Sequence, residues 1–136
     1  MQVSNIANKS RRKLPSLRNN GVCIIVAAMK NANIFIDVDL TLVDHNRQLI
    51  SGAKEALQRL VDKGCHLFLW STAGSDYARK IARLYEMTDL FEGFVAKPDI
   101  IVDDMPGTVL DPIHYDVNKE GSWKAVADTI LEKHLD

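Results

Sequence analysis

The sequence predicts an α/β fold, specifically a three-layer α/β/α sandwich around a mainly parallel, Rossmann-like sheet. Three observations predict it: strand-like and helix-like apolar patterns alternate from residue 33 onward, the connections between them are short, and polar residues follow the ends of the apolar runs. Right-handed crossovers between parallel strands place the carboxyl ends of the strands at one edge of the sheet. We therefore expect those polar residues to gather there.

The first predicted strand covers residues 33–38 and leads into a loop or small flap at residues 43–50. Its apolar run is nearly continuous, as in a parallel strand that is covered on both faces. Ser51 can cap a following helix, because a side-chain oxygen at that position accepts a backbone N–H. Gly64 suits the residue that ends such a helix. The apolar positions at helical spacing are Ala53, Ala56, Leu57, Leu60 and Val61.

A second strand is predicted at residues 66–70 and a second helix from Ser75. The strand leads directly to Ser71 and Thr72, which we expect at the same edge of the sheet as the end of the first strand. A short turn near residues 88–91 follows the helix. The apolar positions of the helix are Ala78, Ile81, Ala82 and Tyr85.

Three further strands and one helix are predicted in the rest of the chain. The third strand, at residues 94–96, has a weak apolar signal, whereas the fourth, at residues 100–102, has a strong one. The fourth ends in the pair Asp103-Asp104. Residues 113–117 are a candidate fifth strand, and the last helix should start near Ser122.

Length and composition indicate one soluble domain. A chain of 136 residues with 46% apolar and 26% charged residues has the composition of an ordinary globular protein. No run approaches the ~18 apolar residues of a membrane span, so we expect no membrane partner. Cys23 and Cys65 show neither metal-type spacing nor a disulfide framework. Reduced thiols of this kind indicate a cytoplasmic location.

Charge is distributed unevenly along the chain. Residues 1–30 contain six basic and no acidic residues, whereas the remaining residues carry a formal net charge of −7. An acidic body favours a cation site over a nucleic-acid surface, so nucleic acid is possible but not favoured as a partner. We predict a basic extension at residues 1–30, disordered or dispensable, and a folded domain at residues 31–136. A targeting peptide, an added strand and a basic arm that contacts a partner are alternatives for the extension.

Asp37 and Asp39 come at the end of the first predicted strand with one residue between them. Two carboxylates this close repel each other, and a divalent cation would relieve the repulsion by accepting both charges. Edges of parallel sheets are where α/β proteins carry their binding sites. Ser71 and Thr72, and Asp103 and Asp104, follow two other predicted strands. Because we expect all of these residues at one edge of the sheet, the sequence predicts a functional site there.

Four short motifs in this order resemble those of the haloacid dehalogenase-like (HAD) superfamily, the aspartate-nucleophile phosphatases, over residues 33–116. The segment DVDLT at residues 37–41 resembles the DxDxT motif, and Ser71 matches the second motif. Lys97 matches the third motif and Asp103-Asp104 the acidic fourth. Only five residues separate Lys97 from Asp103, whereas many relatives have a helix there.

The resemblance implies a phosphomonoester hydrolase that works through an aspartyl-phosphate intermediate. Asp37 would be the nucleophile, and Asp39 would protonate the leaving alkoxide and then activate water. The side chains expected to hold the phosphate are Thr41, Ser71, Thr72 and Lys97.

The resemblance also implies Mg²⁺ as the cofactor, which prefers oxygen ligands in near-octahedral geometry. Asp37, the backbone carbonyl of Asp39 and Asp104 would supply the ligands from the protein. Asp103 is the alternative to Asp104, as a ligand or as a partner of the ligand.

Asp39 also favours hydrolysis of phosphate esters over other reactions of the superfamily, because relatives that break carbon–halogen bonds lack this acid. The 29 residues between Thr41 and Ser71, and the 25 between Ser71 and Lys97, leave no room for a cap domain. Capless relatives have open sites and either act on large substrates or use a neighbouring subunit as a lid. A homo-oligomer that supplies a lid is therefore possible here.

Parts of the sequence also resemble proteins of other functions. Residues 100–106 look like the start of a response-regulator receiver domain, but that fold needs roughly 100 further residues and only 30 follow Pro106. A non-catalytic protein that binds a phosphorylated ligand would gain nothing from close, uncompensated carboxylates. A phosphatase of nucleotides or nucleic-acid ends stays open as an alternative. The motifs do not specify the phosphorylated substrate.

Overall fold

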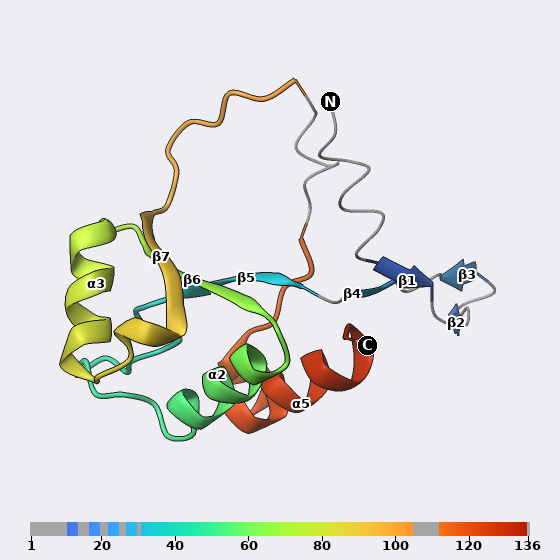
Figure 1. The fold of residues 1–136 in the computed structure, drawn as a ribbon, viewed down its shortest axis with the longest axis horizontal. Helices are drawn as coiled ribbons and strands as arrows, with labels where there is room; N and C mark the ends of the chain where they lie inside the picture. The colour runs from blue at the N-terminus through green and yellow to red at the C-terminus, as the bar shows by residue number, and fades with distance from the viewer. Residues whose placement is uncertain are drawn as a thin grey trace.

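The computed structural model describes residues 11–13, 17–19, 22–24, 27–29, 31–104 and 112–135. These residues form a mixed α/β structure with a three-stranded parallel sheet and four α-helices (Figure 1). From residue 31 the elements are β5 (Asn33–Asp37), α2 (Ala53–Asp62), β6 (His66–Ser71), α3 (Ser75–Leu84), the 3₁₀ helix η1 (Thr88–Leu90), β7 (Phe91–Ala96), α4 (Val117–Glu120) and α5 (Trp123–Lys133). No helix in the described ranges is long and apolar enough to cross a membrane.

Four three-residue strands precede this domain. β1 (Arg11–Lys13) pairs with β4 (Ala27–Met29), and β2 (Leu17–Asn19) pairs with β3 (Val22–Ile24), both antiparallel. Within the described residues, neither pair joins the parallel sheet. That residues 1–30 are disordered or dispensable stays a prediction, and residues 1–10 lie outside the described part.

The parallel sheet has the strand order β5-β6-β7, so consecutive strands are neighbours. Asp37 pairs with Trp70 in the register, and Trp70 pairs in turn with Val95. Ser71 pairs with Ala96 one residue further on. The three strands therefore end at one edge, as predicted, and the residues that follow each strand begin side by side.

One face of the sheet carries the hydrophobic core. Side chains of β6 alternate between buried and half-buried, because successive residues of a strand point to opposite faces. Leu67 and Leu69 are fully buried and share one cluster with the inner faces of the helices. The helical members of this cluster include Leu57, Leu60, Ala78, Ile81, Ala82, Val126, Ala127 and Ile130.

Aromatic side chains occupy the opposite face. Phe35 stacks on Phe68 with 4.9 Å between ring centroids and meets Trp70 edge-on at 5.0 Å. Phe35 is 47% exposed, so this face is less covered than the core face. The α/β class predicted from the sequence is confirmed, and the third layer of the sandwich stays a prediction.

Two predicted strands are not formed. Residues 100–102 adopt no regular structure, and Ile100, Ile101 and Val102 are 83%, 67% and 96% exposed. Apolar β-branched residues favour a strand only where a neighbouring strand pairs with them, and β5 pairs only with β6 among the described residues. Residues 113–116 are also irregular, and α4 begins at Val117.

The helix ends were predicted with mixed success. Ser122 caps α5, since its Oγ accepts a hydrogen bond from the backbone N–H of Ala125 at 3.0 Å. The prediction for α2 was wrong by one residue: Gly52 takes the cap position, with φ of 81°, and Ser51 makes no cap hydrogen bond. Cys65 is a buried free thiol, as expected, and burial raises its pKa.

Candidate functional site

Asp37 ends β5 because the backbone folds back on itself immediately afterwards. The carbonyl oxygen of Val38 accepts hydrogen bonds from three backbone N–H groups, those of Thr41, Leu42 and Val43, at 3.4, 2.9 and 3.1 Å. Leu40 adopts a left-handed φ of 62°, which closes this turn. The turn holds Asp37 at the edge of the sheet with its side chain 35% exposed.

Lys97 and Thr41 both contact the Asp37 carboxylate. The Nζ atom of Lys97 lies 3.1 Å from Oδ1, and the Thr41 hydroxyl donates to Oδ2 at 3.4 Å. Lys97 comes directly after β7, where its backbone N–H donates to the Ser71 carbonyl oxygen at 3.0 Å. Its ammonium group also lies 5.6 Å from the centre of the Trp70 ring. Each Asp37 oxygen therefore has a polar partner at the strand end.

Asp39 is an exposed residue that receives a hydrogen bond from a helix. The phenol of Tyr77, on α3, donates to Asp39 Oδ1 at 2.7 Å. Burial, and then the Asp39 carboxylate, raise the pKa of Tyr77, so the phenol keeps the proton that it donates. Tyr77 was not identified from the sequence. Its place at the third position of a helix that begins near the site edge was the one available signal.

Ser71 and Thr72 occupy the loop between β6 and α3. Ser71 is 2% exposed, and its Oγ accepts a hydrogen bond from the Ala73 backbone N–H at 3.0 Å. Its carbonyl oxygen accepts the backbone N–H of Gly74 at 3.2 Å, which tightens the turn. Thr72 is exposed. Ser71 thus shapes the loop next to Lys97, and the phosphate contact expected of both hydroxyls stays a prediction.

The turn after Asp37 is also held from the C-terminal part of the chain. The indole N–H of Trp123 donates to the Thr41 carbonyl oxygen at 2.8 Å, and the Asn118 amide donates to the Leu40 carbonyl oxygen at 3.0 Å. Trp123 is 3% exposed and belongs to the hydrophobic core. Asn118 was not identified from the sequence, because no local pattern links it to a turn 78 residues away.

Asp103 and Asp104 are exposed and follow the strand-free residues 100–102. Figure 1 shows this segment, in orange, leaving the end of β7 and arching away from the sheet. The described residues contain no group of three or more His, Cys, Asp or Glu side chains that could hold a metal ion. The structure therefore brings together Asp37, Thr41 and Lys97, and Asp39 follows Asp37 by two residues. Among the described residues, Asp103 and Asp104 do not join them in a group that could hold a metal ion.

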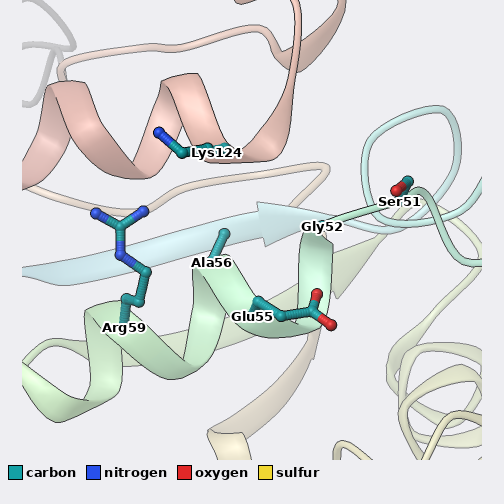
Figure 2. Close-up of a pocket in the computed structure, with 6 residues that line it drawn as sticks. All are labelled: Ser51, Gly52, Glu55, Ala56, Arg59 and Lys124. Carbon is teal, nitrogen blue, oxygen red and sulfur yellow. The ribbon is translucent and has the colours of Figure 1, made fainter.

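Two surface grooves lie near the helices. One, of about 410 Å³ and shown in Figure 2, runs between α2 and α5. It contains no motif residue, and its Arg59 and Lys124 both bond to Asp128, at 2.7 and 2.8 Å. The other, of about 460 Å³, includes Tyr77 and is therefore adjacent to Asp39. Its lining residues are Arg47, Tyr77, Lys80, Ile81, Arg83 and Leu84.

Comparisons with protein-family models, with characterised proteins and with solved structures find no match to this chain. The resemblance to HAD phosphatases therefore depends on the motif residues and on their arrangement at the end of β5. That arrangement offers a carboxylate beside an ammonium group and a second carboxylate beside a phenol. Such a site can attack an electrophile, offset developing negative charge and transfer a proton.

Proposed function

We propose that this chain is a Mg²⁺-dependent phosphomonoester hydrolase that works through an aspartyl-phosphate intermediate. One observation carries the proposal: Asp37, at a strand end, lies 3.1 Å from the Lys97 ammonium group. A nucleophilic carboxylate and a phosphate dianion repel each other, and a cation next to the carboxylate is what their approach requires.

In the first step an oxygen of Asp37 attacks phosphorus. The new P–O bond forms as the bond to the leaving alkoxide breaks, with the two oxygens roughly in line. Lys97 would move from the carboxylate to the phosphate oxygens as charge spreads over them, while the Thr41 hydroxyl keeps the other carboxylate oxygen oriented. The product of this step is an acyl phosphate on Asp37.

Asp39 would supply the proton to the leaving alkoxide. The Tyr77 phenol occupies Oδ1, so Oδ2 is the oxygen from which a proton would be transferred. In the second step a water attacks phosphorus, Asp39 takes the proton from this water, and the Asp37–phosphate bond breaks to release inorganic phosphate. The acid and base roles are thus returned to their starting states.

Magnesium would be held by Asp37, the backbone carbonyl of Asp39 and either Asp104 or Asp103. When bound, it would offset the negative charge of the phosphate and of the carboxylates. The donor atoms have the chemistry that Mg²⁺ prefers, but only the Asp37 and Asp39 part of the set is assembled at the strand end. The steps above therefore depend on residues of the chain alone.

The finer architecture belongs to the proposal. In a three-layer sandwich without a cap, the third layer would cover the face that carries Phe35 and Phe68, and the site would stay open to solvent. The open site suits a phosphorylated substrate brought to a strand edge, with a second copy of the chain as a lid. The buried free thiol of Cys65 supports a reducing, cytoplasmic setting.

Hydrolysis of 4-nitrophenyl phosphate by the full chain with Mg²⁺ tests the function. Asp37→Asn should lower the rate by ~10³-fold or more, because the amide oxygen is a poor nucleophile. Asp62→Asn, an exposed change on α2, is the matched control and should retain wild-type activity and the same melting temperature. EDTA should abolish turnover and excess Mg²⁺ should restore it. Full activity of Asp37→Asn would overturn the proposal.

A further inference from the structure

The groove beside Tyr77 has a basic rim and an apolar floor. Ile81 and Leu84 contribute the floor, and Leu84 is 64% exposed although it is a large apolar residue. Lys80 and Arg83 are three residues apart on α3 and so lie on neighbouring turns of one helix face. Arg47 closes the groove from the loop after β5.

The lining of this groove carries positive charge and no negative charge. None of its lining residues is acidic, and none of the described ion pairs involves Arg47, Lys80 or Arg83. The groove between α2 and α5 differs, because there one carboxylate, Asp128, neutralises both cations. A groove that is lined by three cations and by no acidic residue has the charge that an anionic ligand requires.

The loop is built to hold Arg47 in place. Its guanidinium lies 5.6 Å from the centre of the Tyr77 ring. The backbone of Arg47 has a left-handed φ of 59°, and its N–H donates to the Asp44 carbonyl oxygen at 2.9 Å. The carbonyl oxygen of Arg47 accepts a hydrogen bond from the Tyr85 phenol. A strained backbone conformation with a bond on each side fixes the direction in which the side chain leaves the loop.

Tyr77 connects the groove to the proposed general acid. Its ring lines the groove, while its hydroxyl donates to Asp39 at 2.7 Å. A general acid must lie next to the oxygen that it protonates, which belongs to the leaving group. If Asp39 has this role, the groove is on the leaving-group side of the site. The inference therefore rests on the proposed function.

We propose that this groove binds the leaving group of the substrate, and that this leaving group carries a second phosphate. Its carbon skeleton would lie on Ile81 and Leu84, and the second phosphate would contact Lys80, Arg83 and Arg47. A volume of about 460 Å³ fits a small molecule. A polymer would need a basic surface that continues beyond the groove, and residues 31–136 carry a net negative charge.

Binding to the Asp37→Asn variant tests this without turnover. Isothermal titration calorimetry should give a nucleoside 3′,5′-bisphosphate ~10-fold or more tighter binding than the matching 3′-monophosphate. Adding Lys80→Gln and Arg83→Gln should remove that difference. Arg79→Gln, on the same helix but beside Phe94 and outside the groove, is the control and should preserve it.

Each outcome separates the inference from the proposed function. Equal binding of the two nucleotides, or a preference that survives Lys80→Gln with Arg83→Gln, would overturn the inference even if the wild type hydrolyses 4-nitrophenyl phosphate. If the preference depends on these two residues but the wild-type chain hydrolyses no phosphate ester, the result would support the groove and overturn the proposed function. Tighter binding of a 3′-phosphorylated oligonucleotide than of the bisphosphate would overturn the small-molecule class.

Discussion

Asp37 and Asp39 lie at a turn that is closed by backbone hydrogen bonds to Val38, whereas Asp103 and Asp104 follow three exposed apolar residues. In the first pair, each carboxylate accepts a bond from a side chain of another element, Lys97 or Tyr77. In the second, the preceding residues have no strand partner among the described residues. The difference separates the part of the proposed site that would react with phosphate from the acidic pair that would complete the proposed metal site.

The comparison teaches that the backbone turn at the first pair forms from contacts that are close in sequence. The turn after β5 is closed by hydrogen bonds to Val38 across three to five residues, so little chain entropy is lost in forming it. The second pair would need a pairing across more than sixty residues of chain to reach Asp37, with correspondingly greater demands on the rest of the fold.

Asp39→Asn gives the largest expected effect. The rate on an alkyl phosphate should fall by ~10²–10⁴-fold, because the alkoxide then leaves without a proton. The rate on 4-nitrophenyl phosphate should fall less, since nitrophenolate leaves without help. Steady-state kinetics on both esters measures the ratio. Equal losses on the two esters would contradict the acid role and leave Asp39 with the base role in the second step or with a positioning role.

Paired truncations would compare the two regions directly. Leu69→Ala should lower the free energy of unfolding by about 2–5 kcal/mol, because Leu69 is fully buried in β6. Ile101→Ala should change it by only about 0.5 kcal/mol or less, because Ile101 is 67% exposed. Urea unfolding followed by circular dichroism measures both. A loss of 2 kcal/mol or more in Ile101→Ala would mean that residues 100–102 are packed in solution.

Replacing the acidic pair would sharpen the metal half of the comparison. Asp104→Asn should raise the Mg²⁺ concentration needed for half-maximal activity by ~10–100-fold, and Asp103→Asn should raise it less. Asp99→Asn, earlier in the same exposed segment, is a matched control. Activation curves against Mg²⁺ that coincide for wild type and both variants would remove the acidic pair from the site.

The smallest expected effect concerns pH and the C-terminal helix. Burial, and then Lys133, lower the pKa of His134, whose ring nitrogen Nε2 is 2.6 Å from the Tyr115 hydroxyl. Because the unfolded chain binds this proton more readily, the stability from neutral His134 is complete above the unfolded pKa of about 6.5 and declines as pH falls toward the folded value. His134→Phe should flatten melting temperature against pH between 7 and 5. An unchanged slope would contradict this.

The sequence predicted what short-range physics controls. The three parallel strands, the capping role of Ser122 and the buried thiol of Cys65 follow from apolar periodicity and turn chemistry, and the structure has all of them. Lys97, matched on motif order alone, does contact Asp37.

The failures concern partners that are distant along the chain. Tyr77 and Asn118 reach the turn after β5 from other elements, so no local pattern identifies them. Residues 100–102 have the composition of a strand, but composition cannot supply a neighbour to pair with. A fifth strand was a candidate at residues 113–117, but the Asp116 side chain accepts the Asn118 backbone N–H and a helix starts at Val117.

The chain contains two tryptophans, and both adjoin the segment that carries Asp37, the proposed nucleophile. Trp123 donates its indole hydrogen to the turn after Asp37, and Trp70 lies beneath the Lys97 ammonium group. Indole emission responds to nearby charge and polarity, so the protein has two intrinsic fluorescent reporters next to the residues around Asp37. Binding of a ligand can therefore be followed by the ultraviolet emission of the protein itself, without a dye or label.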